Sequence, residues 1–261
     1  MKPTIPFRPA LILLALGFLA GRVHAQVSVK DSAIATPMIF AAGGYQLPGV
    51  DMADRFGANA NIGGGFLQKL KSGLLVGADG AFMFSDRVRE TNILDNISTP
   101  PDDNGIRHII DGNGTYSEIF MYERGFILSA RVGYLYPCLG PNKNSGLVAL
   151  AGIGFMQHKI RIENKDNDTP QLAGDLVKGY DRLSNGRMFN QFIGYMNLSN
   201  NHLVNFFAGL EVTEGFTRNR RSVNYDTGKH DGTKRLDMLY GLRFGWVLPL
   251  YSRAPEKVYY Y

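Results

Sequence analysis

The stretch LDMLYGLRFGWVLPL, residues 236–250, decides the fold class because apolar side chains occupy every second position. Successive side chains of a strand point to opposite faces, so one face of this segment would be wholly apolar. The other face would carry Asp237 and Arg243 between small and apolar residues. An ordinary strand has about five or six residues, and this alternation is much longer. It predicts a strand that crosses a membrane with its apolar face towards lipid.

The same two-residue period recurs along the chain. Four stretches repeat it cleanly, and three more are strand-like with a less regular phase. Together with residues 236–250 they give eight predicted strands, at 38–46, 60–67, 74–84, 126–136, 147–162, 189–198, 204–213 and 236–250.

The connections between these strands alternate in length. Those at 69–73, 137–146 and 199–202 are short, and those at 47–57, 85–117, 163–188 and 214–235 are longer. A bilayer leaves no partner for the backbone of an edge strand, so the sheet has to close. The sequence therefore predicts an all-β, eight-stranded antiparallel up-and-down transmembrane β-barrel. Its short turns are expected to be periplasmic and its four longer loops extracellular.

The N-terminus has the pattern of an export signal. Two positive charges precede the apolar run at 10–21, and Val23-His24-Ala25 resembles a cleavage site. We expect a signal peptide at 1–25, a periplasmic N-terminal segment at 26–36, the barrel at 37–251 and a periplasmic tyrosine-rich tail at 252–261. The predicted location is the outer membrane.

Charge excludes a nucleic-acid partner. The chain has 28 Lys and Arg, 23 Asp and Glu, and a net charge of +5. Three of the basic residues and none of the acids precede residue 26. The predicted mature chain is thus near neutral, unlike strongly basic nucleic-acid binders.

Five charged residues fall on the predicted inward faces. A buried charge has to be paired to be tolerated, so the three acids and two arginines are expected to form an internal network that plugs the lumen. These residues are Asp79, Arg131, Glu211, Asp237 and Arg243.

Four segments carry a resemblance to known proteins, at 45–57, 178–183, 245–251 and 253–261. Through them the chain resembles eight-stranded outer-membrane barrels of the Bacteroidota type, with an OmpA-like or PorT-like architecture. That resemblance implies a structural role, or an accessory subunit of a secretion or outer-membrane assembly complex such as the type IX system.

Two alternatives remain open. The first is a lipid A-modifying enzyme at the outer rim that uses His158 and Ser184 with Asp175 or Asp181, because a nucleophile needs a base and an orienting acid. The second is a small passive channel. The interpretation that we favour is non-enzymatic, with no catalytic residues, no cofactor and no metal site. The lone Cys138 is expected to be incidental.

Outer-membrane lipid and lipopolysaccharide are the expected partners, with protein partners in a secretion or barrel-assembly complex as a further possibility. The fourth long loop and its flanks concentrate positive charge that suits phosphates or an acidic protein, at Arg218, Arg220, Arg221, Lys234 and Arg235. Aromatic rings favour the membrane interface, so the predicted anchors are Trp246, Tyr251, Tyr259, Tyr260 and Tyr261.

Overall fold

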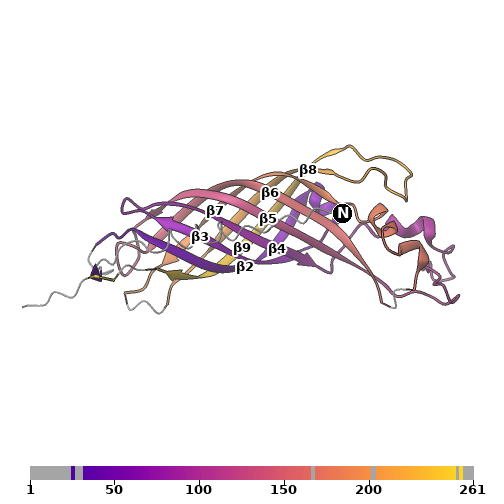
Figure 1. Ribbon diagram of the computed structural model, residues 1–261, viewed down its shortest axis with the longest axis horizontal. Coiled ribbons are helices and arrows are strands. Elements are labelled where there is room, and N and C mark those ends of the chain that lie inside the picture. Colours follow the sequence, from indigo (N-terminus) through magenta and orange to yellow (C-terminus); the bar gives the residue numbers. More distant parts are fainter. Residues whose placement is uncertain (1–24, 27–31, 166–167, 201–203, 251–252, 255–261) are drawn as a thin grey trace, which may run out of the picture.

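The computed structural model describes residues 25–26, 32–165, 168–200, 204–250 and 253–254. Eight antiparallel strands form a closed barrel in which every strand pairs with its neighbours in sequence and the last pairs with the first. The long connections gather at one end of the barrel, called here the loop end, and the short ones at the other, the turn end (Figure 1). The predicted fold class is confirmed.

The barrel strands are longer than the predicted segments. They are β2 (Thr36–Val50), β3 (Asn59–Lys69), β4 (Leu74–Ser85), β5 (Ile119–Tyr136), β6 (Gly146–Asn164), β7 (Ser184–Asn197), β8 (Phe206–Asn219) and β9 (Lys234–Pro249). The two-residue β1 (Ala25–Gln26) and β10 (Arg253–Ala254) pair with each other outside the barrel. The loop end carries α2 (Asp51–Arg55) and the 3-10 helices η1 (Thr91–Ile97), η2 (Pro170–Leu172) and η3 (Leu176–Gly179).

Two local features differ from the expectation. The strand expected at 126–136 begins at Ile119, because residues 119–125 continue the ladder with β6 from Ile119↔Asn164 onward. Glu123 and Arg124 interrupt the apolar alternation there and hide the strand in the sequence. The first long loop is short in fact, because β2 runs to Val50 and α2 follows directly.

The alternation in β9 separates the two faces as the sequence predicts. Leu242, Phe244 and Trp246 are exposed on the outside, whereas Arg243 and Val247 are buried. The pattern holds around the barrel, so the exterior is a band of large apolar side chains. The members on the other strands include Ile39, Ile62, Phe66, Val76, Phe82, Leu128, Val132, Ile153, Ile193 and Leu210.

The lumen is filled by side chains. An apolar cluster near the turn end includes Phe40, Leu135, Phe192 and Val247. A second cluster reaches into the loops and includes Met52, Phe56, Ile93, Leu172 and Tyr180. None of the described helices is long and apolar enough to cross a membrane.

Most of the predicted signal peptide and tail lie outside the described residues. That applies to residues 1–24 and to Tyr251, Tyr259, Tyr260 and Tyr261. The cleavage site and the anchoring role of the tail stay predictions.

Candidate functional site

Four of the five residues predicted to line the interior meet in one network between the two apolar clusters. The Nε atom of Arg131 lies 2.6 Å from Oδ1 of Asp79, and an Nη atom lies 2.7 Å from Glu211. Arg243 lies 2.6 Å from Asp79 and 2.8 Å from Glu211. Each arginine thus contacts both carboxylates. This ionic quartet is neutral in total, as charges held away from water require.

The quartet crosses the lumen. Asp79 and Arg131 lie on the paired strands β4 and β5, and Glu211 and Arg243 on the paired strands β8 and β9. Neither β4 nor β5 pairs with β8 or β9. The adjoining cavity on the turn side, which Arg131 and Arg243 help to line, has a volume of about 10 Å³. That is about the smallest space that holds one water molecule, so the cross-section is closed.

A small residue makes room for one of the arginines. Gly152 on β6 faces inward beside the quartet, and a Cβ atom there would lie 3.0 Å from Cγ of Arg131 and 2.2 Å from Oδ1 of Asn190. The Nδ2 atom of Asn190 in turn donates to Ser129 Oγ at 3.3 Å. Ser129 also hydrogen-bonds to Asp79, so the quartet is held by neutral neighbours as well.

The fifth predicted residue, Asp237, belongs to a separate cluster nearer the loop end. It forms an ion pair with Arg55 of α2, accepts from Thr217 Oγ1 at 2.5 Å and lies 2.8 Å from Nε2 of His158. Arg55 was not predicted from the sequence. In the sequence, Arg55 follows Asp51 and Asp54 in a segment expected to be a loop. Nothing in that pattern indicates that a helix directs its side chain into the barrel.

The predicted Ser/His pair lies inside the barrel wall. His158 and Ser184 face each other across β6 and β7, and both are fully buried. The Ser184 hydroxyl donates to the carbonyl of Arg182 at 3.0 Å. Of the candidate acids, Asp181 pairs with Arg221, and Asp175 pairs with Lys178. The pockets at the turn end, at the rim and on the exterior are not lined by His158, Ser184 or the two candidate acids.

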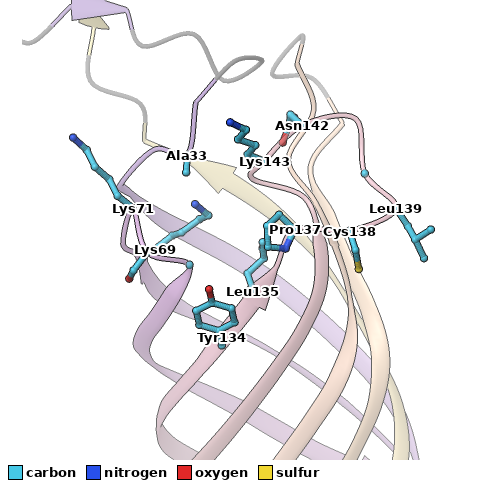
Figure 2. A pocket seen from close by; sticks show the side chains of 13 residues that line it. Ala33, Lys69, Lys71, Tyr134, Leu135, Pro137, Cys138, Leu139, Asn142 and Lys143 are labelled. Carbon is cyan, nitrogen blue, oxygen red and sulfur yellow. The ribbon is translucent and has the colours of Figure 1, made fainter.

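The turn end is closed by the segment that precedes β2. Lys69 is buried there and donates to the carbonyl of Ile34 at 3.0 Å and to Asn144 Oδ1 at 2.9 Å. The amide of Ile34 donates to the same oxygen at 2.9 Å. Figure 2 shows the pocket beside this seal, with Lys71 and Lys143 from two different turns at its mouth. The thiol of Cys138 is free and partly exposed.

Three long connections are tied together at the loop end. Arg182 contacts Glu90 at 2.9 Å and Asp226 at 2.6 Å, and so joins residues from the second, third and fourth long loops. The Nδ2 atom of Asn96 donates to Tyr180 and to the carbonyl of Tyr225. We call residues 86–118, 168–183 and 220–233 the loop cap, because these contacts make one folded layer above the barrel.

The predicted phosphate-binding residues fall into two groups. Arg221 and Arg235 are taken up by ion pairs with Asp181 and Asp231. Burial alone would raise the pKa of the Asp231 carboxyl, but hydrogen bonds from Arg235 and Thr233 lower it to about 2. The other three, Arg218, Arg220 and Lys234, line one groove at the loop-end rim.

Trp246 is the only predicted anchor among the described residues. Its side chain is 56% exposed and lies in the apolar exterior near the turn end. The described residues contain no group of three or more potential metal ligands.

Comparisons with known proteins add distant similarities only. No family model and no curated protein matches the chain. The solved structures that it resembles include Ail of Yersinia pestis (8% identity, 82% of this chain and 98% of that chain covered, TM-score 0.39). They also include the Neisserial surface protein A (9% identity, 81% of this chain and 96% of that chain covered, TM-score 0.39). A third is OprG of Pseudomonas aeruginosa (12% identity, 84% of this chain and 98% of that chain covered, TM-score 0.38). At these values the similarities assign neither a family nor a function.

Proposed function

We propose that the chain is a non-enzymatic integral β-barrel of the outer membrane, with a structural role and a lumen closed to diffusion. The observation that carries this proposal is an apolar exterior around a closed barrel whose cross-section is bridged by the ionic quartet. Apolar surface of this extent is costly in water and is satisfied by lipid. The closed ladder leaves no strand edge in the bilayer.

The single tryptophan tests membrane insertion. Trp246 is the only tryptophan of the chain and points outward, so its fluorescence should be strongly quenched by lipids that carry a quencher on the acyl chain. Protein refolded into vesicles should also migrate faster on gels before boiling than after it. Unquenched fluorescence in a sample with this folded mobility would contradict insertion.

Conductance separates the closed barrel from the small-channel alternative. Protein inserted into a planar bilayer should give no stable open current, because the quartet bridges the lumen and the contacts of Lys69 close its turn end. A long-lived open pore of the wild-type protein would overturn the closed-lumen proposal. The barrel and its membrane location would stand.

The non-enzymatic role is supported by the burial of His158 and by its contact with Asp237 rather than with a nucleophile. Incubation with lipid A should leave the mass of the lipid unchanged. A mass change that disappears in a His158→Ala variant with native folded mobility would establish the enzyme alternative instead.

An accessory subunit of a secretion or assembly complex is the second candidate. The observation that favours it is the loop cap, because a surface already held by ion pairs loses little entropy when a partner binds. Affinity purification from native membranes should then recover stoichiometric partners. Recovery of the bare monomer would leave the structural role alone. The type IX system and the phylum Bacteroidota remain predictions from the sequence resemblance.

A further inference from the structure

A groove of about 690 Å³ lies at the loop-end rim, over the outward faces of β7, β8 and β9. Five cations line it, and one of them, Arg235, is held in an ion pair with Asp231. The other four are exposed: Arg187 on β7, Arg218 on β8, Arg220 just after β8 and Lys234 at the start of β9. Arg187 was not among the residues predicted from the sequence, because it is distant in the chain from the fourth loop.

The cations are crowded together without a bound acid. Arg218 and Lys234 stand directly opposite each other in the β8–β9 ladder, and Arg187 is diagonal to Arg218 across β7 and β8. Like charges in such positions repel. Within the described residues, none of these four side chains forms a salt bridge. An anion in the groove would relieve the repulsion.

The acids near the groove do not neutralise it. Asp51 lines one side, and its Oδ2 atom accepts the amide of Leu236 at 2.7 Å. Glu214 lies on the same face of β8 two residues before Phe216, diagonal to Arg187, and accepts from Gln191 at 3.4 Å. Arg235 also lines the groove and forms its ion pair with Asp231. Two carboxylates thus stand beside four unpaired cations, which leaves the site positive.

The lower wall of the groove is apolar. Phe216 is 58% exposed beside Arg218, and Leu236 follows Lys234 on the outer face of β9. That face continues through Met238, Tyr240 and Leu242 into the apolar exterior. A molecule that fits both the cations and the apolar wall has a phosphate group at the rim and a hydrocarbon chain along the barrel exterior.

We infer that this groove binds the phosphorylated headgroup of a membrane lipid, with the acyl chains lying along β9. The inference rests on the proposed membrane location, because the lipid is reached from the bilayer. Arginine forks and the compact lysine charge are the side chains that recognise phosphate. Arginine and lysine would bind the phosphate group of a soluble molecule in the same way. The apolar wall favours a lipid over a soluble phosphate as the ligand.

The test uses full-length protein in nanodiscs of neutral phosphatidylcholine, titrated with phosphatidic acid or with bisphosphorylated lipid A. Each cation at a lipid surface contributes about fivefold to affinity, so Arg218→Gln/Lys234→Gln should weaken binding about 25-fold. The matched control is Arg107→Gln/Lys229→Gln, which removes two exposed cations of the loop cap outside the groove. It should bind like the wild type.

A titration with a soluble phosphate distinguishes a lipid ligand from a free phosphate ligand. Glycerol phosphate should bind far more weakly than the lipid, and equal affinity would overturn the lipid assignment. Equal loss in the groove variant and the control would overturn the site itself. Failure of the proposed function is distinguishable, because the protein would then show no quenching of Trp246 by lipid and no folded gel mobility. A folded, inserted protein that binds neither lipid overturns this inference alone.

Discussion

Arg243 on β9 places an Nη atom 2.6 Å from Oδ2 of Asp79 on β4, although these two strands share no backbone pairing. The contact spans 164 positions of sequence. Together with Arg131 and Glu211 it joins two halves of the barrel wall that the ladder connects only through other strands. The quartet therefore acts as a brace as well as a plug.

Removing one acid of this brace should destabilise the barrel. Glu211→Gln leaves two buried arginines with one carboxylate, and breaking a buried pair in this way costs about 3 kcal/mol. Urea unfolding of protein refolded in lipid measures the loss. Glu214→Gln is the control, because Glu214 lies three residues away on the outward face of the same strand. Its expected cost is below about 0.5 kcal/mol. Equal costs for the two variants would refute the bracing role.

A larger side chain in the space beside Arg131 should also destabilise the barrel. Gly152→Val adds atoms where a Cβ already meets Asn190 and Arg131. Overpacking of this kind costs about 1–3 kcal/mol, seen as a lower urea midpoint. Ala151→Val places the same side chain on the opposite face of β6 and should be close to neutral. Wild-type stability of Gly152→Val would mean that the interior is looser than these contacts indicate.

Arg182 should control the order of the loop cap. Its guanidinium contacts Glu90 and Asp226, and hydrogen bonds to charged groups contribute about 1.5–3 kcal/mol each. In Arg182→Gln we expect about tenfold faster proteolytic cleavage of the loops in the folded protein. Arg161→Gln removes an exposed ion pair with Glu163 and is the control. Unchanged cleavage in Arg182→Gln would show that apolar packing alone holds the cap.

The pair of Asp231 and Arg235 predicts a pH dependence at the loop end. The pKa of the Asp231 carboxyl falls from its ordinary 3.8 to about 2 in the folded protein. Folding therefore favours the ionised form, and this contribution is present above about pH 4 and lost as the pH falls through 2. Carbon-detected NMR titration should give a midpoint near 2. In Arg235→Gln the midpoint should return towards 3.8, and an unchanged midpoint would rule out Arg235 as the cause.

Residue alternation predicts much of the fold from the sequence. In β9, Leu242, Phe244 and Trp246 on one face and Arg243 on the other already specify which side meets lipid. Glu123 shows where that signal fails. It is an acid in a strand, buried at the loop end, and its partner Asn59 comes from a different strand. A two-residue period carries no information about such a partner.

The candidate sites divide in the same way. The sequence assigns Asp79, Arg131, Glu211 and Arg243 to inward faces, because the face follows from the local period of the strand. It cannot show that Asp237 pairs with Arg55, since that depends on how α2 folds back over the barrel.

By itself, the sequence determined the strands, their inward and outward faces and the alternation of short and long connections, because all three depend on neighbours along the chain. Only the tertiary structure decided which charges meet. The register of β7, β8 and β9 brings Arg187 beside Arg218 and Lys234, and the closed ring of strands places Asp79 against Arg243 across the lumen. Ion pairs act over a few ångströms of space, and the partner of an inward charge can lie across the lumen, on a strand far away in sequence.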